Sequence, residues 1–416
     1  SRPEPGRIEL TGLLAMSMAL AALGVDLMLP AFGDIEVDLG LDPGTNAITG
    51  LITAYFLGLA LGQLVYGPLA DRFGRRPTLF LGYGVYAVGA LAGAMLPTFG
   101  GILVARFVWG LGAAGPRVIT LAVVRDRWEG ERMSRAMSLI MAVFILVPVV
   151  APTLGAGIAQ VASWRWLFTG PVIAAALMTV WAWRRLPETL SEDNRRDLDA
   201  RRILAAARHV ATHRQTAAYT LALTALFGVF TSYLGSSEVI YGDVFDAADA
   251  FPLLFGGLAA VMGGAMVVNS RVVDRVGTRR LAHGVLLGYL VAAALLVGLG
   301  LATGGTPPLW LFMVGMALML SAHALLIPNF NTIAMHPMGA IAGTASSVIG
   351  AVQLAVGALL GAVLDRMFDG TILPLAFGFL GYGVIALLLV LWAEGGQLFR
   401  RLDVHDPAPG AAPEPE

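Results

Sequence analysis

The sequence lacks cysteine and lysine altogether and is poor in charge of either sign. Without cysteine it has neither disulfides nor thiolate metal ligands. Charged residues make up 13% of the 416 residues, against about 25% in an ordinary soluble domain. The missing lysine also excludes a phosphate-binding Gly-x-x-x-x-Gly-Lys-Ser/Thr loop. These absences argue against an enzyme, a metal centre, a bound cofactor and a pump driven by its own ATP hydrolysis.

Hydrophobic residues dominate instead, at 57% of the chain with a mean hydropathy of +0.75. Apolar runs of roughly 20 residues recur, and each is long enough to cross a hydrocarbon layer about 30 Å thick as a helix. The sequence therefore predicts an all-α membrane protein with twelve transmembrane helices. We expect the spans at 8–32, 46–69, 77–96, 101–124, 135–159, 164–186, 215–239, 252–272, 281–303, 308–333, 340–363 and 371–395.

The arginines are distributed unevenly between the two sides of these spans. If the N-terminus is inside, 23 of the 27 lie in inner loops or at the ends of the chain. The positive-inside rule then places both termini in the cytoplasm. Basic residues along a membrane surface, rather than in a soluble module, argue against nucleic-acid binding. Arginine without lysine, together with abundant alanine and glycine, is typical of GC-rich bacteria, so we expect a multi-pass protein of the bacterial cell membrane.

Two related halves are predicted. The longest polar stretch, 187–214, separates six spans in 1–186 from six in 215–398, and a tail at 399–416, rich in proline and alanine, is expected to be disordered. The linker can form a short amphipathic helix over 198–213 or remain a solvated connector. The string Gly-Pro-Leu-Ala-Asp-Arg-Phe-Gly-Arg-Arg at 67–76 recurs as Ser-Arg-Val-Val-Asp-Arg-Val-Gly-Thr-Arg at 270–279, which favours pseudo-symmetric six-helix bundles.

The repeated string resembles the signature loop of the major facilitator superfamily, which lies between spans 2 and 3 and again between spans 8 and 9. Residues 103–114 resemble the span-4 motif of drug:proton antiporters, with Trp109 in place of the commoner glutamine. Residues 26–30 (Asp-Leu-Met-Leu-Pro) and 343–347 (Gly-Thr-Ala-Ser-Ser) are similar to the Bcr/CflA branch of twelve-span antiporters. The span-5 motif is only partly kept, at 151–157. The resemblance implies a monomeric transporter that binds substrate between its halves.

Asp26 is the first candidate for proton coupling. An ionised carboxylate inside a membrane is costly and usually marks a functional path, although Asp26 can also reach outer water at the end of its span. Arg106, six residues into span 4, lies at a matching depth and could either pair with Asp26 or brace span 1 against span 4. Glu238 ends span 7, the repeat partner of span 1, and is either a second proton or cation site or a solvated residue.

Arg117 follows Arg106 by eleven residues, close to three helical turns, which places both on one face of span 4. It can bind an acidic group of the substrate, hold a carboxylate or approach inner water. Further candidates for substrate binding are aromatic or polar residues within the spans, although ordinary helix packing also explains them. They are Tyr55, Phe56, Trp109, Phe144, Phe227, Phe230, Tyr233, His323 and Gln353.

A charge cluster is expected at the cytoplasmic ends of spans 2 to 4, with its weaker copy after span 8. Its salt bridges could form a latch that closes the inner side, whereas topogenesis alone also explains the arginines. The gating candidates are Asp71, Arg72, Arg75, Arg76, Arg125, Asp126, Asp274 and Arg275. Pro148, Pro152 and Gly155 in span 5 can bend the helix or allow close packing and are candidates for a hinge.

Together these features predict proton-coupled export of small, largely apolar compounds, such as drugs or antibiotics, by alternating access. The partners would be a small-molecule substrate, protons and the lipid bilayer. A metabolite importer or facilitator of the same fold is the alternative, and a membrane sensor that does not transport is a weaker one, because no sizeable soluble domain accompanies the spans.

Overall fold

The computed structural model describes residues 5–42, 46–192, 195 and 200–399. Within them, twelve helical segments are long and apolar enough to cross a membrane, and no strand occurs. This confirms the predicted fold class, and outside the extended first and seventh spans the observed boundaries lie within six residues of the predicted ones. The predicted tail lies outside the described residues, apart from Phe399.

Most spans are single α-helices. The first bundle holds α1 (Arg7–Asp26), α3 (Gly50–Phe73), α4 (Arg75–Met95), α5 (Phe99–Arg127), α6 (Gly130–Val161) and α7 (Trp166–Arg185). The second holds α9 (Arg214–Val239), α10 (Phe251–Val276), α11 (Thr278–Ala302), α12 (Leu309–Met335), α13 (Ala342–Asp365) and α14 (Leu373–Ala393). The helix α8 (Ala200–Thr212) links them, which confirms the helical alternative for the linker.

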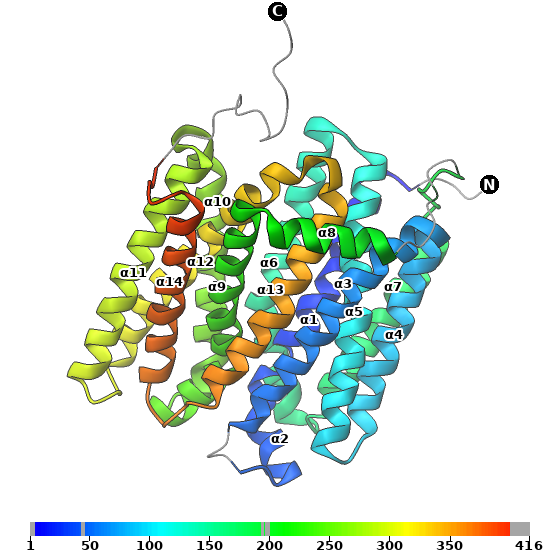
Figure 1. The fold of residues 1–416 in the computed structure, drawn as a ribbon. Coiled ribbons are helices and arrows are strands. Elements are labelled where there is room, and N and C mark those ends of the chain that lie inside the picture. The colour runs from blue at the N-terminus through cyan, green and yellow to red at the C-terminus, as the bar shows by residue number, and fades with distance from the viewer. Residues whose placement is uncertain (1–4, 43–45, 193–194, 196–199, 400–416) are drawn as a thin grey trace, which may run out of the picture.

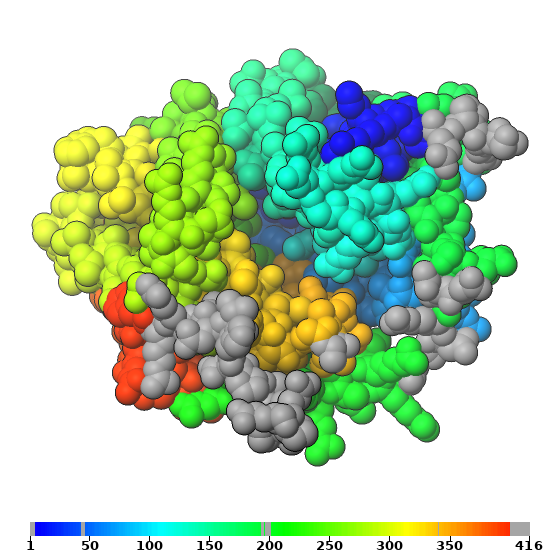
Figure 2. Space-filling model, turned by 90° about the horizontal axis from the view of Figure 1, so that it is seen from above, coloured from blue at the N-terminus to red at the C-terminus, as the bar shows by residue number. Residues whose placement is uncertain are grey.

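Figure 1 shows the first bundle in blue to teal beside the second in green to red, with α8 crossing one end of both. We call this end the α8 face, and the opposite end, where α2 (Phe32–Leu39) lies, the α2 face. Figure 2 views the α8 face and shows a depression near its centre, between the cyan and teal segments of the first bundle and the yellow-green and orange segments of the second.

The internal sequence repeat corresponds to a repeated backbone turn. Gly74 separates α3 from α4 at φ 102°, and Gly277 separates α10 from α11 at φ 88°. Positive φ at these values favours glycine. The residue two positions later binds the last span of its own bundle in both copies: Arg76 donates to the Trp183 carbonyl at 3.0 Å, and Arg279 lies 3.4 Å from the Glu394 carboxylate.

The first span is interrupted. The helix α1 ends at Asp26 and is followed by the 3-10 turn η1 (Leu29–Ala31), which contains Pro30, and then by α2. Gly155 of α6 packs on this interruption so closely that a Cβ there would overlap the Leu27 carbonyl oxygen. The hinge predicted for Pro148, Pro152 and Gly155 stays a prediction, since α6 runs through both prolines as one helix.

Glycines allow α3 and α5 to cross at backbone contact. A Cβ at Gly58 would overlap the Phe107 carbonyl oxygen, and one at Gly110 would overlap that of Tyr55. Small residues permit such close approach between membrane helices. The crossing holds α5, and with it Arg106, at a fixed position relative to α3.

We expect Gly58→Ala or Gly110→Ala to destabilise the protein by about 1–3 kcal/mol, the usual cost of overpacking. Thermal unfolding in detergent would measure the effect. Gly84→Ala on α4 is the matched control, because its Cβ would meet no atom within 4 Å and alanine is the better helix former. Equal unfolding temperatures for the three variants would contradict this role of the crossing.

Candidate functional site

Asp26 is the last residue of α1 and is 4% exposed. Within the described part of the chain, neither a hydrogen bond nor an ion pair involves its carboxylate. The interruption of α1 directly after Asp26 places this acid where the span loses its regular helix. A nearly buried carboxylate without a partner is an unusual and costly feature of a membrane bundle.

Arg106 lies at the same level of the bundle, as its position in the sequence predicted. Its Nη1 donates to the Gly24 carbonyl at 2.6 Å and its Nε to the Leu51 carbonyl at 3.1 Å, so Arg106 braces α5 against α1 and α3. The guanidinium also lies 4.6 Å and 4.8 Å from the ring centroids of Tyr55 and Trp109. The structure does not bring it into an ion pair with Asp26.

Arg117 lies farther along α5 and is half-buried. Among the described residues, its guanidinium takes part in no hydrogen bond or ion pair. It is close enough to Tyr55 for the two groups to interact electrostatically. A cation held in a transmembrane helix without a protein partner can accept a polar or anionic group from outside the protein.

Tyr55 and Trp109 are packed inside the first bundle rather than against a cavity. The Tyr55 hydroxyl donates to the Ala21 carbonyl at 2.8 Å. The Trp109 ring, 1% exposed, contacts the rings of Tyr55, Tyr86 and Phe168 at centroid distances of 5.5–6.0 Å. In this conformation neither ring is accessible to substrate, so packing explains both better than direct binding does.

A row of rings joins the two bundles. Phe56 of α3 meets Phe227 of α9 edge-on at 5.4 Å, and Phe227 lies 6.0 Å from Phe230. Phe230 stacks on His323 of α12 at 4.9 Å. Both ring nitrogens of His323 are buried and have no hydrogen-bond partner among the described residues. The row therefore combines an apolar surface with an unsatisfied polar ring.

The other predicted substrate residues are less closely grouped. Tyr233 is buried and stacks on Phe255 at 5.9 Å within the second bundle. Phe144 on α6 and Gln353 on α13 are half-buried. Among the described residues, no ring pair or hydrogen bond joins these three residues to the aromatic row.

The charge cluster at the α8 face is built around Arg75. Its guanidinium binds Asp71 at 2.6 Å and Asp126 at 2.9 Å, which ties together the ends of α3, α4 and α5. Glu188, which the sequence did not single out, accepts from the backbone N–H groups of Arg75 at 2.9 Å and Arg76 at 3.1 Å. A carboxylate at these positions satisfies the exposed start of α4.

These contacts lie within the first bundle and its linker. Arg72 is placed over the Phe73 ring, and Arg125 is exposed. In the second copy, Asp274 and Arg275 are exposed, and Thr278 stands where the first copy has Arg75. The cluster organises three span ends, and within the described part of the chain the bonds of Arg75 stay in the first bundle and its linker, whereas the predicted latch would bridge the bundles.

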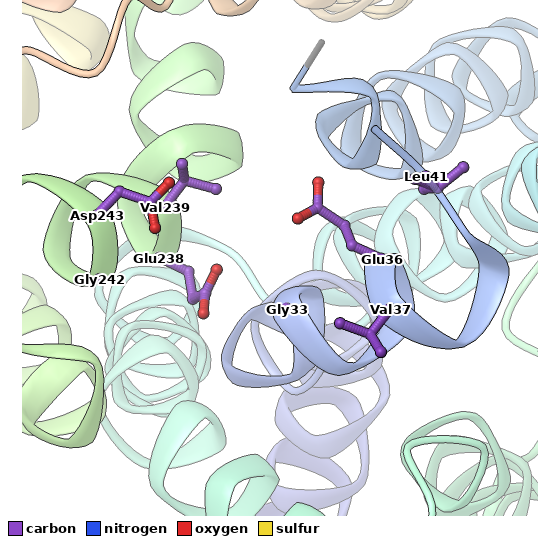
Figure 3. A pocket seen from close by; sticks show the side chains of 8 residues that line it. All are labelled: Gly33, Glu36, Val37, Leu41, Glu238, Val239, Gly242 and Asp243. Carbon is purple, nitrogen blue, oxygen red and sulfur yellow. The ribbon is translucent and has the colours of Figure 1, made fainter. Parts of the chain in front are cut away.

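A pocket of about 220 Å³ opens between the bundles at the α2 face. Figure 3 shows Glu36 of α2 directed across it toward Glu238 of α9, with Asp243 beside Glu238. Gly33, Val37, Leu41, Val239 and Gly242 complete the lining. Glu238, predicted as a possible second coupling residue, thus faces an acid of the other bundle across a space wide enough for water.

The sequence did not single out Asp365, the last residue of α13, because the predicted span ended at 363. Asp365 is 3% exposed and contacts α9 through hydroxyl groups. Its position at the end of a long apolar run is the signal that could have identified it. Asn46, which contacts it from the first bundle, lies in a loop and carried no comparable signal.

Known proteins resemble this chain over most of its length. A Bicyclomycin resistance protein homolog from Haemophilus influenzae is 30% identical over 383 residues, 91% of this chain and 93% of that protein. A Chloramphenicol resistance protein from Pseudomonas aeruginosa is 30% identical over 85% of this chain and 84% of its own length. Multidrug resistance protein D from Escherichia coli is 25% identical over 92% and 93%.

Solved structures share the fold at lower sequence identity. The crystal structure of a D-xylose-proton symporter superposes with a TM-score of 0.76 at 14% identity, covering 94% of this chain and 99% of the symporter. Residues 14–362 also match the family model of the Major Facilitator Superfamily. With twelve apolar helical segments and relatives aligned along nearly their whole length, the chain belongs to the Major Facilitator Superfamily.

Proposed function

We propose that the protein exports small, largely apolar compounds across the bacterial cell membrane by alternating access, in exchange for protons. The observation that carries the proton coupling is Asp26, a nearly buried acid at the interruption of span 1 that has no hydrogen-bond or ion-pair partner among the described residues. A proton neutralises this carboxylate when it is closed off from water, and its release restores a charge that favours hydration. The charge of one residue can thereby follow the conformation of the bundle.

Arg106 supports this role without forming an ion pair. Its two bonds to backbone carbonyls fix a positive charge at the level of Asp26, on three helices that meet there. A fixed positive charge favours the ionised form of a nearby carboxylate. Arg106 can therefore promote release of the proton from Asp26 when the surroundings rearrange. Asp26 is therefore proposed as the proton carrier and Arg106 as its positioning residue.

The arginine distribution supports a cytoplasmic α8 face. Arg72, Arg75 and Arg76, the arginines of α8 and those after α10 all lie at this end, as the positive-inside rule requires of short inner loops. The central depression in Figure 2 then opens toward the cytoplasm, the side from which an exporter collects its substrate. We propose a monomer with both termini inside.

Substrate binding is proposed at the seam between the bundles. The aromatic row suits a flat apolar compound, and His323 and Arg117 offer polar groups that have no hydrogen-bond partner among the described residues. Mainly apolar lining with a few polar groups is the usual composition of a small-molecule site. The names of the relatives, which refer to bicyclomycin, chloramphenicol and multidrug resistance, favour antibiotics as the first compounds to test.

We expect cells that lack their own drug pumps to accumulate less of at least one antibiotic or dye when they produce this protein. Collapse of the proton gradient with an uncoupler should raise accumulation to that of cells without it. If accumulation of the compound instead rises when the protein is expressed and is unaffected by the uncoupler, the result would support a facilitator. Substrate uptake accompanied by inward proton flux would support the importer.

A further inference from the structure

The two bundles meet at the α2 face through a small polar contact formed by Asn46, Ser232, Ser236 and Asp365. We call these four residues the α2-face contact. Asn46 precedes α3 in the first bundle, Ser232 and Ser236 lie one turn apart on α9, and Asp365 ends α13. All four are at least 95% buried. No candidate role for transport described above uses them.

The Asp365 carboxylate accepts two hydrogen bonds from serines of its own bundle. Its Oδ1 accepts hydrogen bonds from the Ser232 hydroxyl at 2.5 Å and the Ser236 hydroxyl at 2.9 Å. A buried carboxylate needs such donors, because it loses its hydration. The pair of serines keeps Asp365 in one orientation at the end of α13.

Asn46 connects the first bundle to this group. Its side-chain amide donates to the Ser236 hydroxyl oxygen at 3.2 Å and to the Asp365 backbone carbonyl at 3.0 Å. Asn46 has a φ of 48°, a left-handed conformation that asparagine tolerates better than most residues. Ser236 therefore accepts from one bundle while it donates to the carboxylate of the other.

The contact is tightly packed around Gly235 of α9. A Cβ at Gly235 would lie 3.2 Å from Asp365 Oδ2 and 3.2 Å from Thr49 Cβ, so α9 packs closely against the end of α13 and the turn that precedes α3. Among the described residues, the Asn46 Oδ1 is already buried without a hydrogen-bond partner, and partial separation would also deprive the Asn46 amide of its two acceptors. Because an unsatisfied buried polar group is costly, the contact favours two states, fully closed or fully hydrated.

The acidic pocket beside this contact acts in the opposite sense. Glu36 on the first bundle and Glu238 and Asp243 on the second face the same space in Figure 3. When ionised, like charges on the two sides repel each other and favour separation. The closed α2 face thus requires a local attraction, and Asn46 provides hydrogen bonds at that position.

We propose that Asn46, Ser236 and Asp365 form the latch that keeps the α2 face closed while the α8 face is open. Opening of the α2 face would transfer Asn46 to water, while Asp365 stays bonded to Ser232. The three are positioning residues for alternating access and touch no substrate. The latch rests on the family's two-bundle fold and requires neither proton coupling nor a particular direction of transport.

The absence of cysteine permits a direct test. Val37 in the first bundle and Leu253 in the second are well exposed, so Val37→Cys and Leu253→Cys together accept two spin labels. Pulsed electron resonance in nanodiscs, without substrate or gradient, gives the distances between labels. We expect Ser236→Ala, which removes one hydrogen bond across the contact, to raise the ratio of long to short distances about fivefold, and Asn46→Gly, which removes two, to raise it about thirtyfold.

Matched controls separate the latch from general damage. Ser237→Ala removes a neighbouring buried hydroxyl that bonds only within its own helix, to the Leu234 carbonyl at 3.1 Å, and should leave the distances unchanged. Asn46→Gly keeps the left-handed backbone accessible, and Ser236→Thr should restore the short distance. If Asn46→Gly and Ser236→Ala fold as monodisperse protein and give the distances of Ser237→Ala, the latch is wrong, whatever the export assays show.

Discussion

Replacement of Asp26 by asparagine is expected to reduce proton-driven export to the level of cells without the protein. Asparagine has nearly the same size and keeps hydrogen-bonding groups but cannot take up or release a proton. Because Asp26 has no partner among the described residues, its replacement should disturb the packing little. Substrate binding to purified protein should therefore persist while uptake of protons during export disappears.

The control for this experiment is Asp369→Asn. Asp369 is exposed after α13 and bonds to the Thr371 hydroxyl at 2.6 Å, away from the centre of the bundle. Export by this variant should match the parent protein. Full proton-driven export by the Asp26→Asn protein would refute the coupling role, and loss of substrate binding along with export would indicate a binding role for Asp26 instead.

The membrane spans were predictable because the signal for each is distributed over about 20 residues. An error of two or three positions leaves the apolar run and the length of the helix intact. The turns at Gly74 and Gly277 could also be predicted from the sequence, since each copy of the repeated string carries a glycine where the backbone has positive φ. The interruption of span 1 is different: Pro30 indicates it, but the contact with Gly155 that accommodates it comes from a distant span.

The site was less predictable because its geometry depends on which helices meet. The depth of Arg106 follows from its place in span 4, whereas its bonds to Gly24 and Leu51 follow from the packing of three helices. Trp109 illustrates the limit, since an aromatic residue within the string at 103–114 can point into its own bundle as easily as into a cavity. Asn46 had no local signal at all, because its role arises from the opposite bundle.

Arg106→Lys is expected to have the second large effect. The guanidinium donates in two directions at once, to the Gly24 and Leu51 carbonyls, and its plane lies near the rings of Tyr55 and Trp109. A lysine keeps the charge but has no planar fork and no comparable stacking. The loss of one charged hydrogen bond inside the bundle should cost about 1.5–3 kcal/mol of stability.

If Arg106 positions a charge for Asp26, the export rate should fall by more than the loss of folded protein explains. The reason is that lysine would place its ammonium group elsewhere at the same level. Unfolding temperature and proton-driven export would be measured on the same preparations, at a temperature where the variant stays folded. Arg135→Lys on α6, where the side chain is 73% exposed, is the control and should change neither quantity. If the Arg106→Lys protein is destabilised but exports normally while folded, Arg106 only braces the helices. The proton coupling would then depend on Asp26 and not on Arg106.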